Sequence, residues 1–172
     1  MGILDNLGDL LKQAASGQAS TADLHSAYDQ VAQAVPHGDL ANGISHAFKS
    51  DQTPPFEQMV SGLYGQSDPN QKAGLLNQLL AAFGPGGVSQ ALGAAGGLGA
   101  LAGLKPGEGV TPQNAEQISP QAVEVLAQQA ARKDPSVVDK AAGFYAQHPT
   151  LVKAIGAGAL ALLMSRISAS RR

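Results

Sequence analysis

The chain has 172 residues, enough for one domain or for one domain with an appendage. Apolar residues make up 44% of it, but aromatic residues only 4% and charged residues only 14%, against roughly 25% in an ordinary soluble domain. Because large side chains are so few, the helices must approach one another closely. A lightly charged surface also favours association. The sequence has no cysteine, which excludes disulfides, zinc–thiolate sites and cysteine nucleophiles.

Charge is distributed unevenly along the chain, although the net charge is only −2. Residues 1–71 contain eight acidic and two basic residues, whereas residues 132–172 contain seven basic and two acidic residues. We expect the two ends to attract each other, either within one molecule or head to tail between molecules. The alternative is two solvated faces of opposite sign.

Apolar periodicity and capping residues predict an all-α protein. Apolar residues three or four positions apart predict a first helix over residues 3–14. Ser20, with Asp23 three residues later, predicts the start of a second helix that Pro36 ends. Further helices are expected over residues 39–49, 54–64, 69–83, 120–132, 135–147 and 150–168. No stretch alternates apolar and polar residues as a strand would.

A capping residue followed by proline recurs along the chain and predicts helix starts. Proline suits the first helical position because an N–H there would be unpaired, and the preceding side chain accepts a bond from a free N–H. The pairs are Thr53-Pro54, Asp68-Pro69, Thr111-Pro112, Ser119-Pro120 and Asp134-Pro135. Their spacing along the chain is irregular, so we do not expect a solenoid.

Residues 84–104, GPGGVSQALGAAGGLGALAGL, are apolar but carry almost no side chains. Gly93 and Gly97, and again Gly99 and Gly103, are spaced by four, as in close helix–helix contacts. We expect residues 87–104 to form a helix wedged among others, with a mobile loop as the alternative. A membrane span is less favoured, because the uncharged run is shorter than the roughly 20 residues that a span needs.

This stretch divides the predicted multi-helix bundle into three parts. Residues 1–83 are expected to form an N-terminal helical domain. Residues 84–109 are expected to form a Gly/Ala-rich helix or hinge, and residues 110–172 a C-terminal helical part.

The last predicted helix is apolar on all faces over residues 154–165. It suits a buried core helix, an oligomer interface, or a helix at a membrane surface. The predicted association surface comprises Gly93, Gly97, Gly99, Gly103, Ile155, Leu160, Leu163 and Met164. The predicted contacts to lipid or to an acidic partner are Lys153, Arg166, Arg171 and Arg172.

Several kinds of chemistry find little support in the sequence. The pair of helices at 54–64 and 69–83 resembles a helix-turn-helix, but Lys72 is the only base between Lys49 and Lys105, too few for a phosphate backbone. His37 and Asp39 supply too few ligands for structural zinc. No nucleophile elbow, phosphate-binding loop or dinucleotide fingerprint occurs. We therefore expect no catalytic, cofactor or metal site and no nucleic-acid partner.

The opening MGILDNLGDLLKQ, the Gly/Ala/Leu/Gln composition and the style of LLNQLLAAFGPGG resemble the YidB-like small bacterial proteins of unknown function. This resemblance implies a bacterial origin and a homeodomain-like helical fold. It implies a fold more than a function and transfers no catalytic residues.

Together these features predict a non-enzymatic bacterial protein that acts by self-association or by binding a protein partner through apolar helices. The alternative is a peripheral membrane protein held by the basic, apolar C-terminal helix. The first residues lack the positive start and cleavage site of a secretory signal. We therefore expect a cytoplasmic location, with association with the inner membrane as the alternative.

Overall fold

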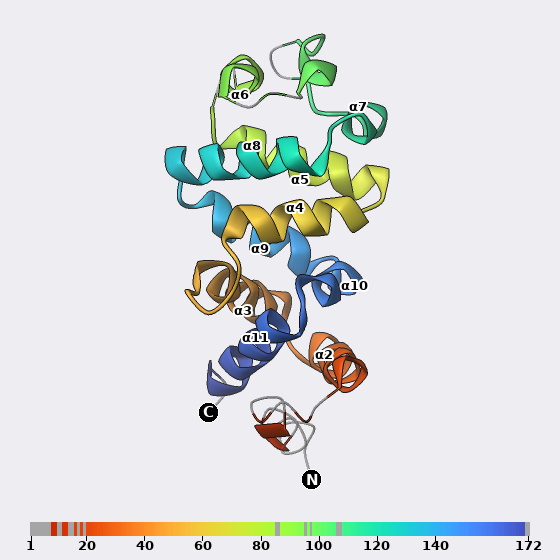
Figure 1. The fold of residues 1–172 in the computed structure, drawn as a ribbon, viewed down its shortest axis with the longest axis vertical. Helices are drawn as coiled ribbons and strands as arrows, with labels where there is room; N and C mark the ends of the chain where they lie inside the picture. The colour runs from red at the N-terminus through yellow and green to blue at the C-terminus, as the bar shows by residue number, and fades with distance from the viewer. Residues whose placement is uncertain are drawn as a thin grey trace.

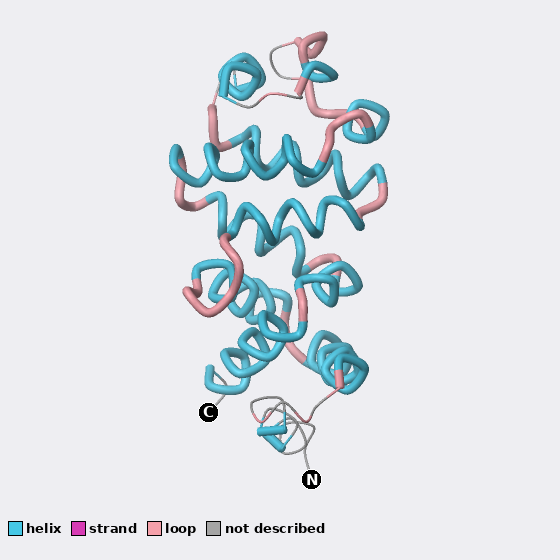
Figure 2. The backbone as a smooth tube through the Cα atoms, in the orientation of Figure 1, coloured by secondary structure: helices cyan, strands magenta, loops and turns pink. Residues whose placement is uncertain are grey.

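The computed structural model describes residues 8–9, 12–13, 16, 18, 20–84, 87–94, 96, 98–105 and 108–170. These residues form helices joined by turns and loops, and none of them lies in a strand (Figure 2). The predicted all-α, multi-helix bundle is therefore confirmed. The first predicted helix, residues 3–14, falls largely outside the described residues.

The helices are stacked along the long axis of the molecule, with α6 and α7 at one end and α2 and α11 at the other (Figure 1). Their bounds are α2 (Thr21–Ala34), α3 (His37–Lys49), α4 (Phe56–Gln66), α5 (Pro69–Ala81), α6 (Gly87–Ala94), α7 (Pro112–Glu116), α8 (Pro120–Lys133), α9 (Val137–Ala146), α10 (Pro149–Val152) and α11 (Ala157–Ser170). Two short 3-10 helices, η1 (Gly99–Leu101) and η2 (Lys153–Ile155), lie between them.

Side-chain caps begin four of these helices as the sequence predicts. Ser20 and Asp68 each form a reciprocal capping box, with Asp23 and Gln71 respectively. Thr111 and Ser119 accept bonds from the backbone N–H groups of Asn114 and Ala122. Each cap satisfies a backbone donor that has no partner within the helix.

Two of the predicted proline-linked helix starts lie two residues too early. The hydroxyl of Thr53 donates to the carbonyls of Ala47 and Ser50 and so closes the end of α3, while α4 begins only at Phe56. Asp134 accepts from the backbone N–H of Ser136 at 3.0 Å in a turn that precedes α9. In both cases a local bond outside the next helix competes for the capping side chain.

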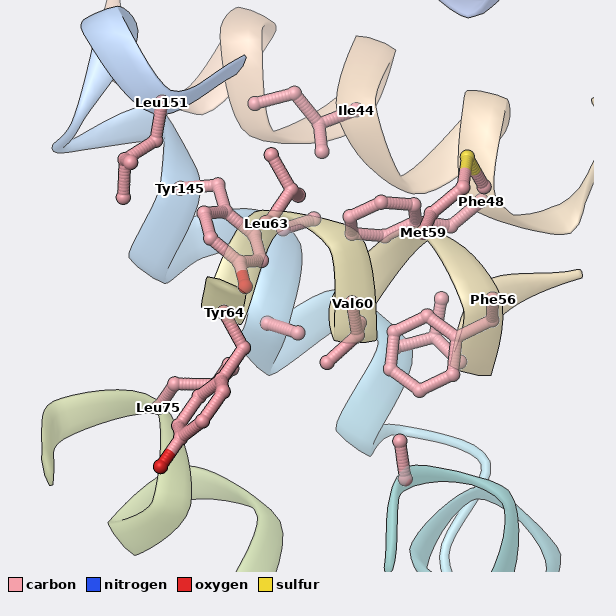
Figure 3. Close-up of a cluster of buried hydrophobic side chains, with 14 of the residues drawn as sticks. Ile44, Phe48, Phe56, Met59, Val60, Leu63, Tyr64, Leu75, Tyr145 and Leu151 are labelled. Carbon is pink, nitrogen blue, oxygen red and sulfur yellow. The ribbon is translucent and has the colours of Figure 1, made fainter. Parts of the chain in front are cut away.

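The core is shared by residues from both ends of the chain. α4 packs on α8, α3 on α9, and α5 on α7, so the segments 1–83 and 110–172 form one hydrophobic cluster rather than separate cores. Figure 3 shows this cluster, in which Phe48 makes edge-to-face contacts with Phe56 and with Tyr145, at centroid distances of 5.3 and 6.1 Å.

The glycine-rich stretch does not form the wedged helix that the sequence suggests. α6 ends at Ala94, and Leu98 begins a turn into η1. A Cβ added to Gly93, Gly99 or Gly103 would meet no atom within 4 Å, so none of these glycines lies at a close helix contact. Gly97 lies outside the described residues.

The last predicted helix is broken rather than continuous. Gly156 has φ 98° and ψ 156°, a conformation that is essentially restricted to glycine, and it separates η2 from α11. After the break, α11 packs on α3 and α2, and Leu160, Leu163 and Met164 are completely buried. The structure thus places this apolar helix in the chain's own core. Among the described residues, no helix combines the length and hydropathy needed to cross a membrane.

Two buried tyrosines should respond in opposite ways to removal of the hydroxyl. The hydroxyl of Tyr145, beside Leu63 in Figure 3, has no hydrogen-bond partner among the described residues, whereas that of Tyr64 donates to the carbonyl of Ala115. A buried unpaired hydroxyl costs free energy. We expect Tyr145→Phe to raise the free energy of unfolding by about 1 kcal/mol and Tyr64→Phe to lower it by about 1 kcal/mol. Urea titrations of the two variants check this; effects of equal sign would contradict it.

The break at Gly156 gives a second prediction, about backbone conformation. Gly156→Ala should lower the free energy of unfolding by about 1–2 kcal/mol, because a Cβ is strained at this φ although the surrounding space is open. Gly62→Ala is the matched control, since Gly62 is helical, exposed and equally open. That control should stabilise the protein by about 0.5–1 kcal/mol. If Gly156→Ala were also stabilising, the break would not exist in solution. Thermal unfolding measures both.

Candidate functional site

A hollow of about 380 Å³ opens where α3, α9 and α11 meet. We call it the polar hollow because most of the side chains that line it are charged or hydrogen-bonding. Its lining consists of Asp39, Asn42, Gly43, Ser45, His46, Lys49, Asp139, Arg166 and Ile167. The site therefore depends on three helices that are far apart in the sequence.

α3 forms the long side of the polar hollow. Asp39, Asn42, His46 and Lys49 follow one another at spacings of three and four residues, which places them on one face of the helix. At 1.5 Å per residue, this face extends over about 15 Å. The hollow is thus long enough for a short peptide segment or several side chains of a partner.

α9 is attached to α3 by a polar cluster in which Asp139 is the shared acceptor. The Nζ of Lys49 lies 2.8 Å from Oδ1 of Asp139, and the hydroxyl of Ser45 donates to the same oxygen. Ser45 is only 7% exposed, so its hydroxyl needs this partner. The bonds from Lys49 and Ser45 hold the pKa of Asp139 below its usual value.

α11 reaches the hollow through a close crossing of α3 at Gly43. A Cβ on Gly43 would lie 3.0 Å from Cγ1 of Ile167, so the missing side chain allows the two helices to approach. This crossing places the neighbouring Arg166 at the hollow. Among the described residues, no carboxylate lies within ion-pair distance of Arg166, and no base lies within that distance of Asp39.

The arrangement suits binding better than nucleophilic catalysis. The hydroxyl of Ser45 is buried and donates to a carboxylate whose lowered pKa makes it a weak base. The exposed guanidinium of Arg166 and the carboxylate of Asp39, by contrast, are available to a ligand. In the described part of the chain, His37 and Asp39 are not joined by a third residue that would complete a metal-binding group.

The other residues singled out in the sequence lie elsewhere. Lys153 pairs with Asp29 at 2.8 Å, so a base from the C-terminal segment meets an acid from the N-terminal segment within the molecule. Ile155 is half-buried at a second, shallower hollow of about 210 Å³, which is lined mainly by apolar side chains of α4 and η2. Arg171 and Arg172 lie outside the described residues.

Ser45 and Asp139 were not singled out from the sequence. They are 94 positions apart, and neither belongs to a recognisable motif. Only the packing of α3 on α9 joins them. Gly43 was likewise missed, because a glycine inside a predicted helix gives no sign of the neighbour that requires it.

The shared acceptor at Asp139 predicts a specific dependence of stability on pH. Because its pKa is lowered in the folded state, its contribution is complete above the ordinary range of aspartate near pH 4 and is lost as the pH falls below that range. Asp139→Asn should lower the free energy of unfolding at pH 5 by less than about 1 kcal/mol, since the side chain is 56% exposed.

This difference between the wild-type chain and Asp139→Asn should shrink towards pH 2, as followed by urea unfolding at several pH values. Asp51→Asn, at an exposed turn after α3, serves as the control and should have little effect. A difference that stays constant from pH 5 to pH 2 would show that the carboxylate's charge is irrelevant.

Comparison with known proteins does not assign this site. No protein-family model matches the chain, and no curated protein or solved structure shows significant similarity to it. The resemblance to YidB-like proteins therefore stays a prediction that rests on the quoted sequence stretches.

Proposed function

We propose that the protein is non-enzymatic and acts by binding an acidic segment of a protein partner in the polar hollow. The observation that carries this proposal is the position of Arg166. Its guanidinium lines the hollow beside His46 and Lys49, and among the described residues it has no carboxylate within ion-pair distance. A guanidinium presents a fork of N–H donors that fits a carboxylate.

The distribution of apolar side chains supports polar recognition over recognition through apolar helices. Val125 is the only large apolar side chain that is exposed among the described residues. The apolar residues Leu160, Leu163 and Met164 face the chain's own core and are unavailable to a partner in this fold. A partner that approaches the described surface therefore meets few large apolar side chains.

The remaining charges of the hollow indicate which groups the bound segment should carry. Lys49 and Asp139 neutralise each other, which leaves the positive charge of Arg166 and the negative charge of Asp39. Asp39 lies in the first turn of α3, where a negative charge is favourable. The partner segment should therefore supply an acid to Arg166 and a hydrogen-bond donor, such as a backbone N–H, to Asp39.

A peptide titration tests the proposal. A short acidic peptide with one glutamate among glycines is added to the ¹⁵N-labelled full chain, with the same peptide carrying glutamine instead as the neutral probe. The acidic peptide should shift the resonances of Asn42, His46 and Arg166. The change Arg166→Ala should weaken this binding about tenfold, equivalent to losing about 1.4 kcal/mol of charged hydrogen bonding.

Arg132→Ala is the matched control, because Arg132 is an exposed arginine on α8, away from the hollow. It should leave peptide binding unchanged. Shifts that do not map to the hollow, or that persist in Arg166→Ala, would overturn the proposal. Cosedimentation with anionic phosphatidylglycerol vesicles that requires Arg166, without any response to the peptide, would favour a lipid surface instead.

A further inference from the structure

Two helical hairpins in the fold are built on the same spacing. In the first, α4–α5, Thr53-Pro54 is followed 15 residues later by Asp68-Pro69. In the second, α8–α9, Ser119-Pro120 is followed 15 residues later by Asp134-Pro135. The cap-proline pairs of the two hairpins are therefore offset by 66 residues, and the helix bounds follow this offset to within two residues. The cap-proline pairs, irregular as one series, thus form a repeated pair.

Seven buried positions of the two hairpins coincide at this offset. Each residue named here is buried, and each pair differs by 66 in number: Phe56 and Ala122, Val60 and Leu126, Tyr64 and Ala130, Leu75 and Ala141, Leu76 and Ala142, Leu79 and Tyr145, and Leu80 and Ala146. The matched helices therefore share part of their buried faces, although Met59 and Leu63 of α4 correspond to the exposed Val125 and the half-buried Gln129 of α8. Large residues at several of these positions in the first hairpin are replaced by alanine in the second.

The contacts around the hairpins are reciprocal. α4 packs on α8, and α5 packs on α9. The helix before each hairpin packs on the second helix of the other hairpin, since α3 contacts α9 and α7 contacts α5. The helix after each hairpin packs on the first helix of the other, since α10 contacts α4 and α6 contacts α8. In Figure 1, α6 and α7 lie above the hairpins, as α10 and α3 lie below them.

Polar bonds also join helices of the two halves. Lys49 and Ser45 of α3 bind Asp139 on α9. At a position that this offset does not relate to Asp139, the backbone N–H of Val110, just before α7, donates to Oδ1 of Asn77 on α5 at 2.7 Å. Packing between the two halves, residues 37–94 and 112–152, is therefore more extensive than packing between the helices within either half.

The segment between the halves, residues 95–111, contains three described glycines that packing does not require. A Cβ on Gly96, Gly99 or Gly103 would meet no atom within 4 Å. At Gly43 and Gly74, by contrast, a Cβ would lie 3.0 Å from Ile167 and 2.7 Å from Phe144. Gly96, Gly99 and Gly103 therefore allow the backbone more conformations than other residues would, although Leu98 and Leu101 beside them are buried. Fully extended, the segment could span roughly 55 Å.

We propose that two copies of the chain form a dimer by exchanging their C-terminal halves. In such a dimer, α7–α11 of each copy packs on α2–α6 of the other, and residues 95–111 act as the hinge. The helix-to-helix contacts between the halves are all kept. The contacts of η1 and the bond from Val110 to Asn77 belong to the hinge and are the ones that the exchange must remake. The interface between the halves lies in the core and is independent of the polar hollow.

Complementation between two full-length variants tests the exchange. Val60→Asp disables the core of the first half, and Leu126→Asp disables the equivalent, fully buried position of the second. Each variant alone should lack a cooperative unfolding transition. Refolded together, they should form dimers that contain one composite unit with two intact halves. The mixture should then regain a cooperative transition and about half of the wild-type helical circular dichroism signal.

The matched control mixes Val60→Asp with Leu63→Asp, two variants that damage the same half and should not complement each other. If the first mixture shows only the average signal of its two separately refolded components, the exchange does not occur.

The wild-type chain gives a second measurement, by light scattering after refolding at rising protein concentration. Its dimer fraction should increase with the refolding concentration. The dimer should persist after dilution, because its separation requires unfolding. A dimer that dissociates at once on dilution would indicate simple surface association and would overturn the exchange.

Discussion

The rest of the fold depends on the burial of α4 against α8. Val60 and Leu126 are completely buried on these two helices although 66 residues separate them. The contact forms only when the two halves of the chain come together, so neither hairpin can cover its apolar face alone. Once α4 lies on α8, α3 is brought to α9 and α7 to α5. The hydrogen bond from Tyr64 to the carbonyl of Ala115 then ties α4 to α7.

A core poor in aromatic residues is filled here by placing large side chains against small ones. α4 contributes Phe56, Met59 and Tyr64, whereas α8 contributes mostly alanine, valine and leucine. Close approach does replace bulky packing, as the composition suggests, but not in the glycine-rich stretch. It occurs at the isolated Gly43 and Gly74, each of which faces a side chain from a distant helix. One of these close approaches, at Gly43, also places Arg166 beside the polar hollow.

The candidate site was foreseen only in part. The sequence predicts Arg166 as a contact to lipid or to an acidic partner, on the basis of its position at the end of an apolar helix. The meeting of Arg166 with α3 and α9 gave no sequence signal, since hydrogen bonds such as that between Ser45 and Asp139 join positions too far apart for any periodicity to connect. The repeat of the two hairpins was visible in the spacing of the proline pairs. This repeat is apparent only when the pairs are taken two by two, because their spacing as one series is irregular.

Interactions within a few residues were sufficient to determine the helices from the sequence. Apolar spacing, the capping boxes at Ser20 and Asp68, and the proline pairs all act within about one helical turn, and most helix ends follow from them to within two residues. The tertiary structure decided how the helices pair, that the last apolar helix breaks at Gly156 and lies in the core, and that three helices enclose a polar hollow. These features depend on which apolar faces meet. An amphipathic helix specifies that a face must be buried, but not the distant segment that buries it.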